Sequence, residues 1–302
     1  MEASPAPRGR AGVWIGLAIM VVSEAATLGR IEPFRSWNTP IAWTGFILFA
    51  DSIVWRARGR SWLRSAPGEF VWLAVASIGL WLVFEGYNLL VRNWYYTGLP
   101  ANPALRLVGY AWSFATIWPA IFEAAALIGV LRGTTAPGTG GRSAAPSIFR
   151  PGEIASIALG AAMLGTPLVA PPELRPYLAA PVWLGFIFLL DPVNRHLGGP
   201  SLAADLEQGT TGRTIDLALG GVMCGFLWEF WNFWAAAKWH YTVPIMERVK
   251  LFEMPLPGYL GFPAFALECF TMFVFVRCVC ARWMDPARGQ CRIDGCPSPV
   301  TR

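Results

Sequence analysis

The chain has 302 residues, of which 55% are apolar and only 14% are charged, and its mean hydropathy is +0.44. A soluble chain usually carries about 25% charged residues, so soluble domains, a disordered chain and a secreted disulfide scaffold are all excluded. The net charge of +5 does not come from a basic stripe of the kind that binds nucleic acid, and we expect no nucleic-acid partner. The composition predicts an all-α, polytopic membrane protein.

Eight apolar runs are long enough for helical membrane spans, which need about 20 mostly apolar residues each. The runs are continuous, whereas the strands of a membrane β-barrel would alternate apolar and polar residues. Prolines interrupt the fifth and sixth runs. In chain order, the predicted spans are 11–28, 38–55, 69–91, 107–131, 153–170, 178–194, 216–236 and 257–279.

Lysine and arginine residues in the connecting segments predict the orientation of the chain. The N-terminus, the even-numbered loops and the C-terminus hold 16 of them, against 8 in the odd-numbered loops. We therefore expect a multi-pass protein of the cell inner (plasma) membrane with both termini in the cytoplasm. Arg8 and Arg10 before the first run would also suit a signal peptide, but Glu24 interrupts that run, and we expect the first span to be retained.

The sequence repeats itself after about 140 residues, and such a repeat fixes the architecture. Trp43 and Asp51 recur as Trp183 and Asp191, and five of the nine positions from Trp43 to Asp51 are identical in the two copies. The match continues with small gaps: Glu85 with Glu229, Asn88 with Asn232, Trp94 with Trp239, Tyr96 with Tyr241, and Glu123 with Glu268.

The repeat predicts two halves, 1–135 and 150–285, each with four spans. A linker rich in glycine, serine, proline and threonine joins them at 136–149, and a cytosolic tail follows at 286–302. Because four spans return the chain to the same side, the halves are expected to be parallel four-helix repeats related by an axis along the membrane normal.

Acidic residues lie inside these apolar runs, where an ionised side chain costs at least about 2.5–3.5 kcal/mol. Lysine and arginine are absent from the runs apart from Arg277, so these acids must be protonated, bind cations or accept hydrogen bonds from neutral donors. The acids inside the runs are Glu24, Asp51, Glu85, Glu123, Asp191, Glu229 and Glu268.

Four of these glutamates are candidate catalytic acids: Glu85, Glu229, Glu123 and Glu268. Asn88 follows Glu85 by three residues and therefore shares its helix face, and Asn232 follows Glu229 in the same way. The structural alternative for these pairs is interhelical hydrogen bonding, and for the aromatic residues it is an interfacial belt. Asp51 and Asp191 are expected to have a structural role. The candidate substrate-binding residues are Asn88, Asn232, Trp94, Tyr96, Trp239 and Tyr241.

Residue types that other membrane enzymes need are scarce. The two histidines, His196 and His240, lie outside the middle of any run, so histidine-held di-iron and haem sites are not expected. The chain also has no GxxxxGK[ST], HExxH or GxSxG motif. Neither a cofactor nor a metal site is predicted, because the spacing of the C-terminal cysteines is not that of zinc pairs. These cysteines are Cys278, Cys280, Cys291 and Cys296.

The order Glu-x-x-Asn, Trp-x-Tyr, Gly-Tyr and then proline before a glutamate resembles one group of carotenoid-pathway membrane proteins. These are the lycopene cyclases of the tandem-repeat or heterodimeric type and the carotenoid hydratases. The resemblance covers roughly 50 residues in each half, and it implies a small, repeated, histidine-poor protein that acts on a carotenoid. The chain departs from the cyclases in having single acids, Glu123 and Glu268, in place of their Pro-x-Glu-Glu pair, and more spans in each repeat.

Three functions are consistent with the sequence. The first is a cofactor-independent enzyme in which buried carboxylic acids start the cyclisation, hydration or isomerisation of a lipid-soluble isoprenoid or polyene by protonation, with aromatic faces stabilising the cation. The second is a proton- or cation-coupled transporter or channel, in which paired acids in two halves relay the ion. The third is a structural membrane scaffold in which the acids join the helices.

Overall fold

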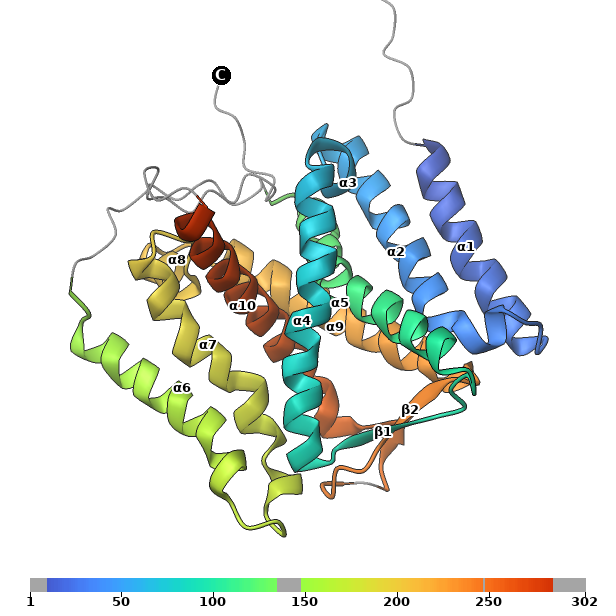
Figure 1. Cartoon of the computed structure of the whole chain (residues 1–302). Helices are drawn as coiled ribbons and strands as arrows, with labels where there is room; N and C mark the ends of the chain where they lie inside the picture. Colours follow the sequence, from blue (N-terminus) through green and yellow to red (C-terminus); the bar gives the residue numbers. More distant parts are fainter. Residues whose placement is uncertain (1–9, 135–147, 247, 285–302) are drawn as a thin grey trace, which may run out of the picture.

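A computed structural model of the chain describes residues 10–134, 148–246 and 248–284, and in these ranges the protein is mostly helical (Figure 1). Ten α-helices lie there, and eight of them have 18 residues or more. The long helices are α1 (Arg10–Leu28), α2 (Phe34–Arg58), α4 (Pro67–Val91), α5 (Pro103–Leu131), α6 (Pro151–Val169), α7 (Ala179–His196), α9 (Gly212–Trp234) and α10 (Gly261–Met284).

Short elements lie at opposite ends of the helical bundle. The helices α3 (Trp62–Ser65) and α8 (Leu202–Glu207) are at one end, here named the α3 end, and the strands β1 and β2 are at the other, here named the strand end (Figure 1). The strands are β1 (Trp94–Thr97), β2 (Lys238–Tyr241), β3 (Lys250–Leu251) and β4 (Met254–Pro255), and two 3₁₀ turns cover Arg175–Tyr177 and Leu256–Leu260.

Five helices of the described chain are long and apolar enough to cross a membrane: α1, α4, α5, α6 and the segment Leu256–Trp283 that contains α10. The eight predicted runs all coincide with long helices, but α2, α7 and α9 do not reach the same apolarity. Each of these three helices contains several polar residues, among them Asp51 in α2, Asp191 in α7 and Glu229 in α9. These polar side chains are buried against other helices, so hydrogen bonds from neighbouring elements have to offset the cost of burying them.

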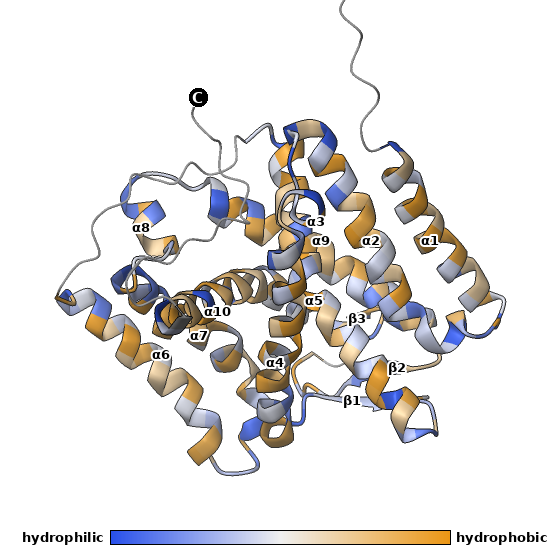
Figure 2. Ribbon diagram, turned by 45° about the horizontal axis from the view of Figure 1, so that its top comes forward, coloured by the Kyte–Doolittle hydropathy of each residue, from blue (hydrophilic) through white to orange (hydrophobic). Residues whose placement is uncertain are grey.

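The same packing pairs occur in both parts of the chain. Helix α1 packs on α2, α2 packs on α5, and α4 packs on α5. In the same order, α6 packs on α7, α7 on α10, and α9 on α10. The helices α1 and α6 lie at the two flanks of the bundle (Figure 1), and hydrophobic positions recur along both of them (Figure 2). Their exposed apolar side chains include Trp14, Val21 and Leu159, which suits contact with lipid. Helix α5 lies inside and also packs against α9.

Glycine pairs allow the flanking helices to approach their neighbours closely, as small residues do in membrane bundles. A Cβ atom on Gly16 would lie 2.5 Å from the carbonyl oxygen of Gly45, across the contact of α1 with α2. A Cβ atom on Gly160 would lie 2.7 Å from the carbonyl oxygen of Gly185 and 2.4 Å from the amide nitrogen of Leu189, across the contact of α6 with α7. The backbones of α1 and α2, and those of α6 and α7, are therefore in direct contact at these glycines.

Most of the predicted linker at 136–149 and the whole predicted tail at 286–302 lie outside the described residues, as do Cys291 and Cys296. Cys224 and Cys269 are free thiols inside the bundle, and Cys280 is a partly exposed one. Among the described residues, no group of three or more histidine, cysteine or acidic side chains could hold a metal ion.

The close contact of α6 with α7 predicts that Gly160→Ala destabilises the protein by about 1–3 kcal/mol, because the added methyl group overlaps backbone atoms. Gly165→Ala in the same helix is the matched control, since a Cβ there meets nothing within 4 Å and alanine favours a helix. Thermal unfolding of the purified protein in detergent measures both variants. Equal stability of the two variants would contradict the packing described here.

Candidate functional site

The strands β1 and β2 form a two-stranded antiparallel ribbon from segments almost 150 residues apart in sequence. Trp94 lies opposite Tyr241, Tyr96 opposite Trp239, and Tyr95 opposite His240. Because alternate side chains of a strand point to the same face, Trp94, Tyr96, Trp239 and Tyr241 share one face of the ribbon. Tyr95 and His240 are on the other face, where their rings stack with centroids 5.4 Å apart.

A cavity of about 520 Å³ lies at the strand end, between the ribbon and the helices. Its volume is in the usual range for small-molecule sites. Both halves of the chain contribute to its wall, which is mainly apolar and rich in aromatic residues, with Arg106 and Lys238 among the few charged ones. The aromatic residues that line it are Trp37, Trp43, Trp81, Trp94, Tyr96, Tyr110, Phe114, Tyr177, Trp183, Trp228, Trp239, Tyr241, Phe262 and Phe265.

Glu85 lies behind this wall and accepts three hydrogen bonds from it. Its Oε1 atom is 2.9 Å from Trp81 Nε1, 3.2 Å from Trp94 Nε1 and 2.5 Å from the hydroxyl of Tyr96. All three donors are cavity-lining residues. The first, Trp81, is one helical turn before Glu85 on α4, so the helix itself places that donor. Three donors therefore converge on one carboxyl oxygen.

Glu229 occupies the corresponding place on α9 but has fewer partners. Its Oε1 accepts one hydrogen bond, from the Tyr241 hydroxyl at 2.8 Å, and that hydroxyl accepts one from Trp239 Nε1 at 2.9 Å. Glu229 is fully buried, and its Oε2 has no hydrogen-bond partner among the described residues. The two glutamates therefore have the same kind of partner but different numbers of donors.

The phenols of Tyr96 and Tyr241 separate the glutamates from the cavity. Burial is the main factor that raises the pKa of both phenols well above the usual value, and the neighbouring Glu85 and Glu229 raise each further. Both hydroxyl groups therefore stay protonated and remain hydrogen-bond donors at neutral pH.

Asn88 and Asn232 hold the two strands against their helices. Asn232 Nδ2 donates to the carbonyl of Trp239 at 2.8 Å, and its Oδ1 accepts from the amide of the same residue at 2.9 Å. Asn88 Nδ2 donates to the carbonyl of Trp94 at 2.9 Å, and its Oδ1 accepts from the amides of Asn93 and Trp94. These asparagines, expected as substrate-binding residues, thus fix the backbone of the tryptophans, and neither lines the cavity.

Glu123 and Glu268 are fully buried and lie outside the cavity wall. Glu268 Oε1 accepts a hydrogen bond from the backbone amide of Phe186 at 3.1 Å. Neither oxygen of Glu123 has a nitrogen or hydroxyl donor among the described residues. None of the four glutamates lines the cavity itself, but Glu85 and Glu229 accept hydrogen bonds from residues of its wall, whereas Glu123 and Glu268 do not.

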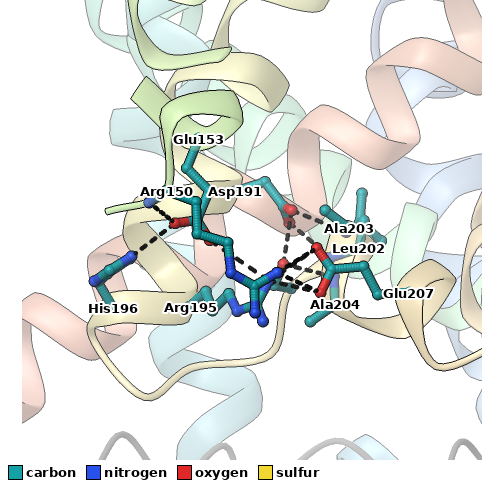
Figure 3. Close-up of polar contacts among 10 residues, drawn as sticks. Arg150, Glu153, Asp191, Arg195, His196, Leu202, Ala203, Ala204 and Glu207 are labelled. Atoms are coloured by element: carbon teal, nitrogen blue, oxygen red, sulfur yellow. Dashed lines mark hydrogen bonds and ion pairs between the residues drawn. The ribbon is translucent and has the colours of Figure 1, made fainter. Parts of the chain in front are cut away.

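Asp51 and Asp191 hold the short helices of the α3 end. Asp191 accepts hydrogen bonds from the Ser201 hydroxyl at 2.7 Å and from the amides of Leu202 and Ala203 at 2.7 and 3.0 Å, at the start of α8 (Figure 3). Asp51 accepts one from the amide of Leu63 in α3 at 2.9 Å. Both contacts agree with the structural role expected for these residues.

Ion pairs beside Asp191 fasten the ends of three helices together (Figure 3). Arg195 of α7 lies 2.9 Å from Glu207 of α8 and 3.5 Å from Glu153 of α6, and Arg150 also reaches Glu207 at 3.2 Å. The cluster is internally neutralised and far from the strand end, so we assign it to the scaffold.

A loop that contains β3 and β4 covers part of the cavity, since Met254 and Pro255 line it. Glu253 pins this loop to the ribbon: its carboxylate is 2.8 Å from Lys238 Nζ and 3.1 Å from His240 Nδ1. Burial alone would raise the pKa of Glu253, but hydrogen bonds from Lys238 and His240 outweigh burial and hold this pKa below its usual value.

Several wall residues were missed by reasoning from the sequence, above all Trp43, Trp81, Trp183 and Trp228. A signal was available for two of them, because Trp43 and Trp183 are equivalent positions of the sequence repeat. In the fold, Trp183 stacks on Phe84 with ring centroids 5.0 Å apart, and Trp43 packs 6.1 Å from Trp228. Each tryptophan thus contacts the part of the chain to which it does not belong.

Comparison of the chain with models of protein families, with curated proteins and with solved structures finds no match. The function is therefore inferred from the geometry of the site.

The asparagine contacts predict that Asn232→Asp lowers the free energy of unfolding by about 1–3 kcal/mol, because the carboxyl group loses the donor to the Trp239 carbonyl. Asn102→Asp is the control: Asn102 only accepts hydrogen bonds, from Ala104 and Leu105 amides, and aspartate accepts them equally well. Chemical denaturation followed by tryptophan fluorescence measures both. A stable Asn232→Asp protein would show that the contact is dispensable.

The lowered pKa of Glu253 predicts a loss of stability in acid. This carboxylate stabilises the fold above its unfolded pKa, and the contribution is lost as the pH falls through the lower folded pKa. Glu253→Gln should be less stable than the natural protein at neutral pH and should lose this part of the pH dependence. Unfolding temperatures between neutral and acidic pH test this, with the exposed Glu173→Gln as control. An unchanged profile in Glu253→Gln would contradict the role of the loop contact.

Proposed function

We propose that the protein is an integral membrane enzyme that binds a lipid-soluble isoprenoid or polyene in the aromatic cavity and starts its cyclisation, hydration or isomerisation by protonation. The proposal rests on one observation: an aromatic cavity with two glutamates bound directly to the N–H and O–H groups of its wall. Aromatic faces stabilise a cation, and a carboxylic acid in a dry site can supply the proton that forms it.

The unequal surroundings of the two glutamates support different roles for them. Glu229 is buried with one donor and one oxygen without a partner, a setting in which a neutral acid costs less than a carboxylate. We assign it as the proton source. Glu85, with three donors, is assigned as the carboxylate that stabilises the cation and later accepts a proton. This assignment leaves Glu123 and Glu268 outside the reaction.

The proton has to pass the Tyr241 hydroxyl, because this group lies between Glu229 and the cavity. An alkene carbon takes the phenolic proton while the phenol oxygen takes one from Glu229, which becomes a carboxylate. The positive charge is left on the other alkene carbon. In a cyclisation or isomerisation a neighbouring C–H bond then gives its proton to the Glu85 carboxylate, and in a hydration water adds to the cation and gives its second proton to the same carboxylate.

A two-fold arrangement of two parallel four-helix repeats, with eight spans, belongs to the proposal. The ribbon supports it, because Tyr95 and His240, which are equivalent in the sequence repeat, lie opposite each other, as a two-fold axis between them requires. The reciprocal contacts of Trp43 and Trp183 agree with it. We further propose that the α3 end faces the cytoplasm of a cell whose inner membrane holds the protein, with both termini on that side.

A transporter would use the same acids, but the wall of this cavity is aromatic and its glutamates lie one layer behind it, which favours chemistry on an apolar substrate. A carotenoid is the substrate that the resemblance to lycopene cyclases and carotenoid hydratases suggests. The aromatic wall is compatible with any polyene or isoprenoid that fits it.

The test compares lipid extracts, by mass spectrometry, from polyene-producing cells that express the natural protein, Glu229→Gln or Tyr241→Phe. We expect a new cyclised, hydrated or isomerised product with the natural protein, reduced about 100-fold or more in both variants, because general acid catalysis contributes at least that factor. Tyr95→Phe, on the other face of the ribbon, is the matched control and should keep full activity.

Three results would reject the proposal. Identical extracts with and without the protein would exclude an enzyme acting on these lipids. A lipid or ion that only changes its distribution across the membrane would indicate transport. Full activity in Gln variants of all four glutamates, with folding intact, would indicate that the acids only join the helices.

A further inference from the structure

A second pair of acids lies inside the bundle, away from the cavity. Asp51 is on α2 and Glu123 is on α5, two helices that pack against each other. Their side chains are almost completely buried, with 1% and 0% of the residue surface exposed. The proposed reaction uses neither residue.

The two carboxyl groups are neighbours: Asp51 bonds to Leu63 of α3, the adjacent Trp62 stacks on Phe122 with ring centroids 6.1 Å apart, and Asp51 is the charged side chain that acts on Glu123. Asp51 Oδ1 accepts from the Leu63 amide at 2.9 Å. Asp51 Oδ2 and both oxygens of Glu123 receive no N–H or O–H donor from the rest of the described chain. Carboxylates only accept hydrogen bonds, so two of them can bond to each other only if one carries a proton.

The surrounding charge fits a pair that holds one proton. Arg64 Nε is 4.0 Å from Asp51 Oδ2. A pair with one shared proton has a charge of −1, which the guanidinium balances, whereas two carboxylates or two neutral acids would leave a net charge in a buried region. Two other arginines at this end have partners of their own: Arg132 pairs with Asp216, and Arg58 donates to the Thr134 carbonyl at 3.1 Å.

The equivalent acids of the second half, Asp191 and Glu268, do not form such a pair. Asp191 accepts hydrogen bonds from three donors at the start of α8. Glu268 accepts one from the Phe186 amide. Neither depends on a proton shared with the other, so the pair is a property of the first half alone.

We propose that Asp51 and Glu123 form a proton-binding site in which two carboxyl groups share a single proton. The proton reaches the site from the α3 end, because the Arg64 side chain is 32% exposed and adjoins Asp51. On α5, Glu123 lies six residues beyond the cavity-lining Ile117, about 9 Å along the helix axis. The site therefore stands between the α3 end and the cavity and is separate from the wall that carries the proposed chemistry.

Infrared spectroscopy of the purified protein in detergent tests this site through the C=O stretch of a protonated carboxyl group, identified by its shift in D₂O. At neutral pH the natural protein should show such a band, and both Glu123→Gln and Asp51→Asn should abolish or shift the same band, because the proton belongs to both groups. Asp191→Asn is the matched control and should leave that band unchanged, since its three donors suit a carboxylate.

Two outcomes would overturn the site. If Glu123→Gln removed the band and Asp51→Asn left it unchanged, Glu123 would be protonated alone. If NaCl, compared with choline chloride at equal ionic strength, removed the band from the natural protein, the pair would bind sodium in place of a proton. The salt comparison needs no variant, so it still tests for sodium binding if the substitutions prevent folding.

Discussion

Buried carboxyl groups without basic partners are the constraint around which this bundle is built. Glu85, Glu123, Glu229 and Glu268 make no ion pair within the described residues. Each must be satisfied by neutral donors or carry a proton, because an unsatisfied charge in an apolar interior is too costly to keep. The solutions differ: indole and phenol groups donate to Glu85 and Glu229, a backbone amide donates to Glu268, and for Glu123 we propose a proton shared with Asp51.

The aromatic donors connect this constraint to the cavity. Indole and phenol groups combine one polar atom with a large apolar face. Trp94 and Tyr96 point their polar atoms toward Glu85 and present the rest of their rings to the cavity. The same side chains therefore provide hydrogen-bond donors for the acid and form the aromatic part of the cavity wall. The ribbon makes this possible, because it places both Trp-x-Tyr segments on one face.

Equivalent acidic residues of the two halves have different numbers of hydrogen-bond donors. Glu85 has three donors and Glu229 has one; Asp51 has one backbone donor and Asp191 has three. Such differences separate the protonation behaviour of otherwise identical side chains. A repeated architecture can in this way hold an acid and a base, since duplicated positions only need to lose or gain a donor to change roles.

The sequence by itself determined the class of the protein, the positions of its eight long helices and the repeated Glu-x-x-Asn pattern, because apolar run length and helical spacing are local properties. It predicted eight membrane spans, and five helices of the described chain are apolar enough by composition, since α2, α7 and α9 each contain several polar residues. The cavity itself was decided by the tertiary structure. Strand pairing across almost 150 residues turned four aromatic side chains to one face, and helix packing placed Trp43 and Trp183 in the wall. The contact of Asp51 with Glu123 was equally inaccessible from sequence, because it depends on how α2 meets α5, and no local pattern specifies which buried acid finds which partner.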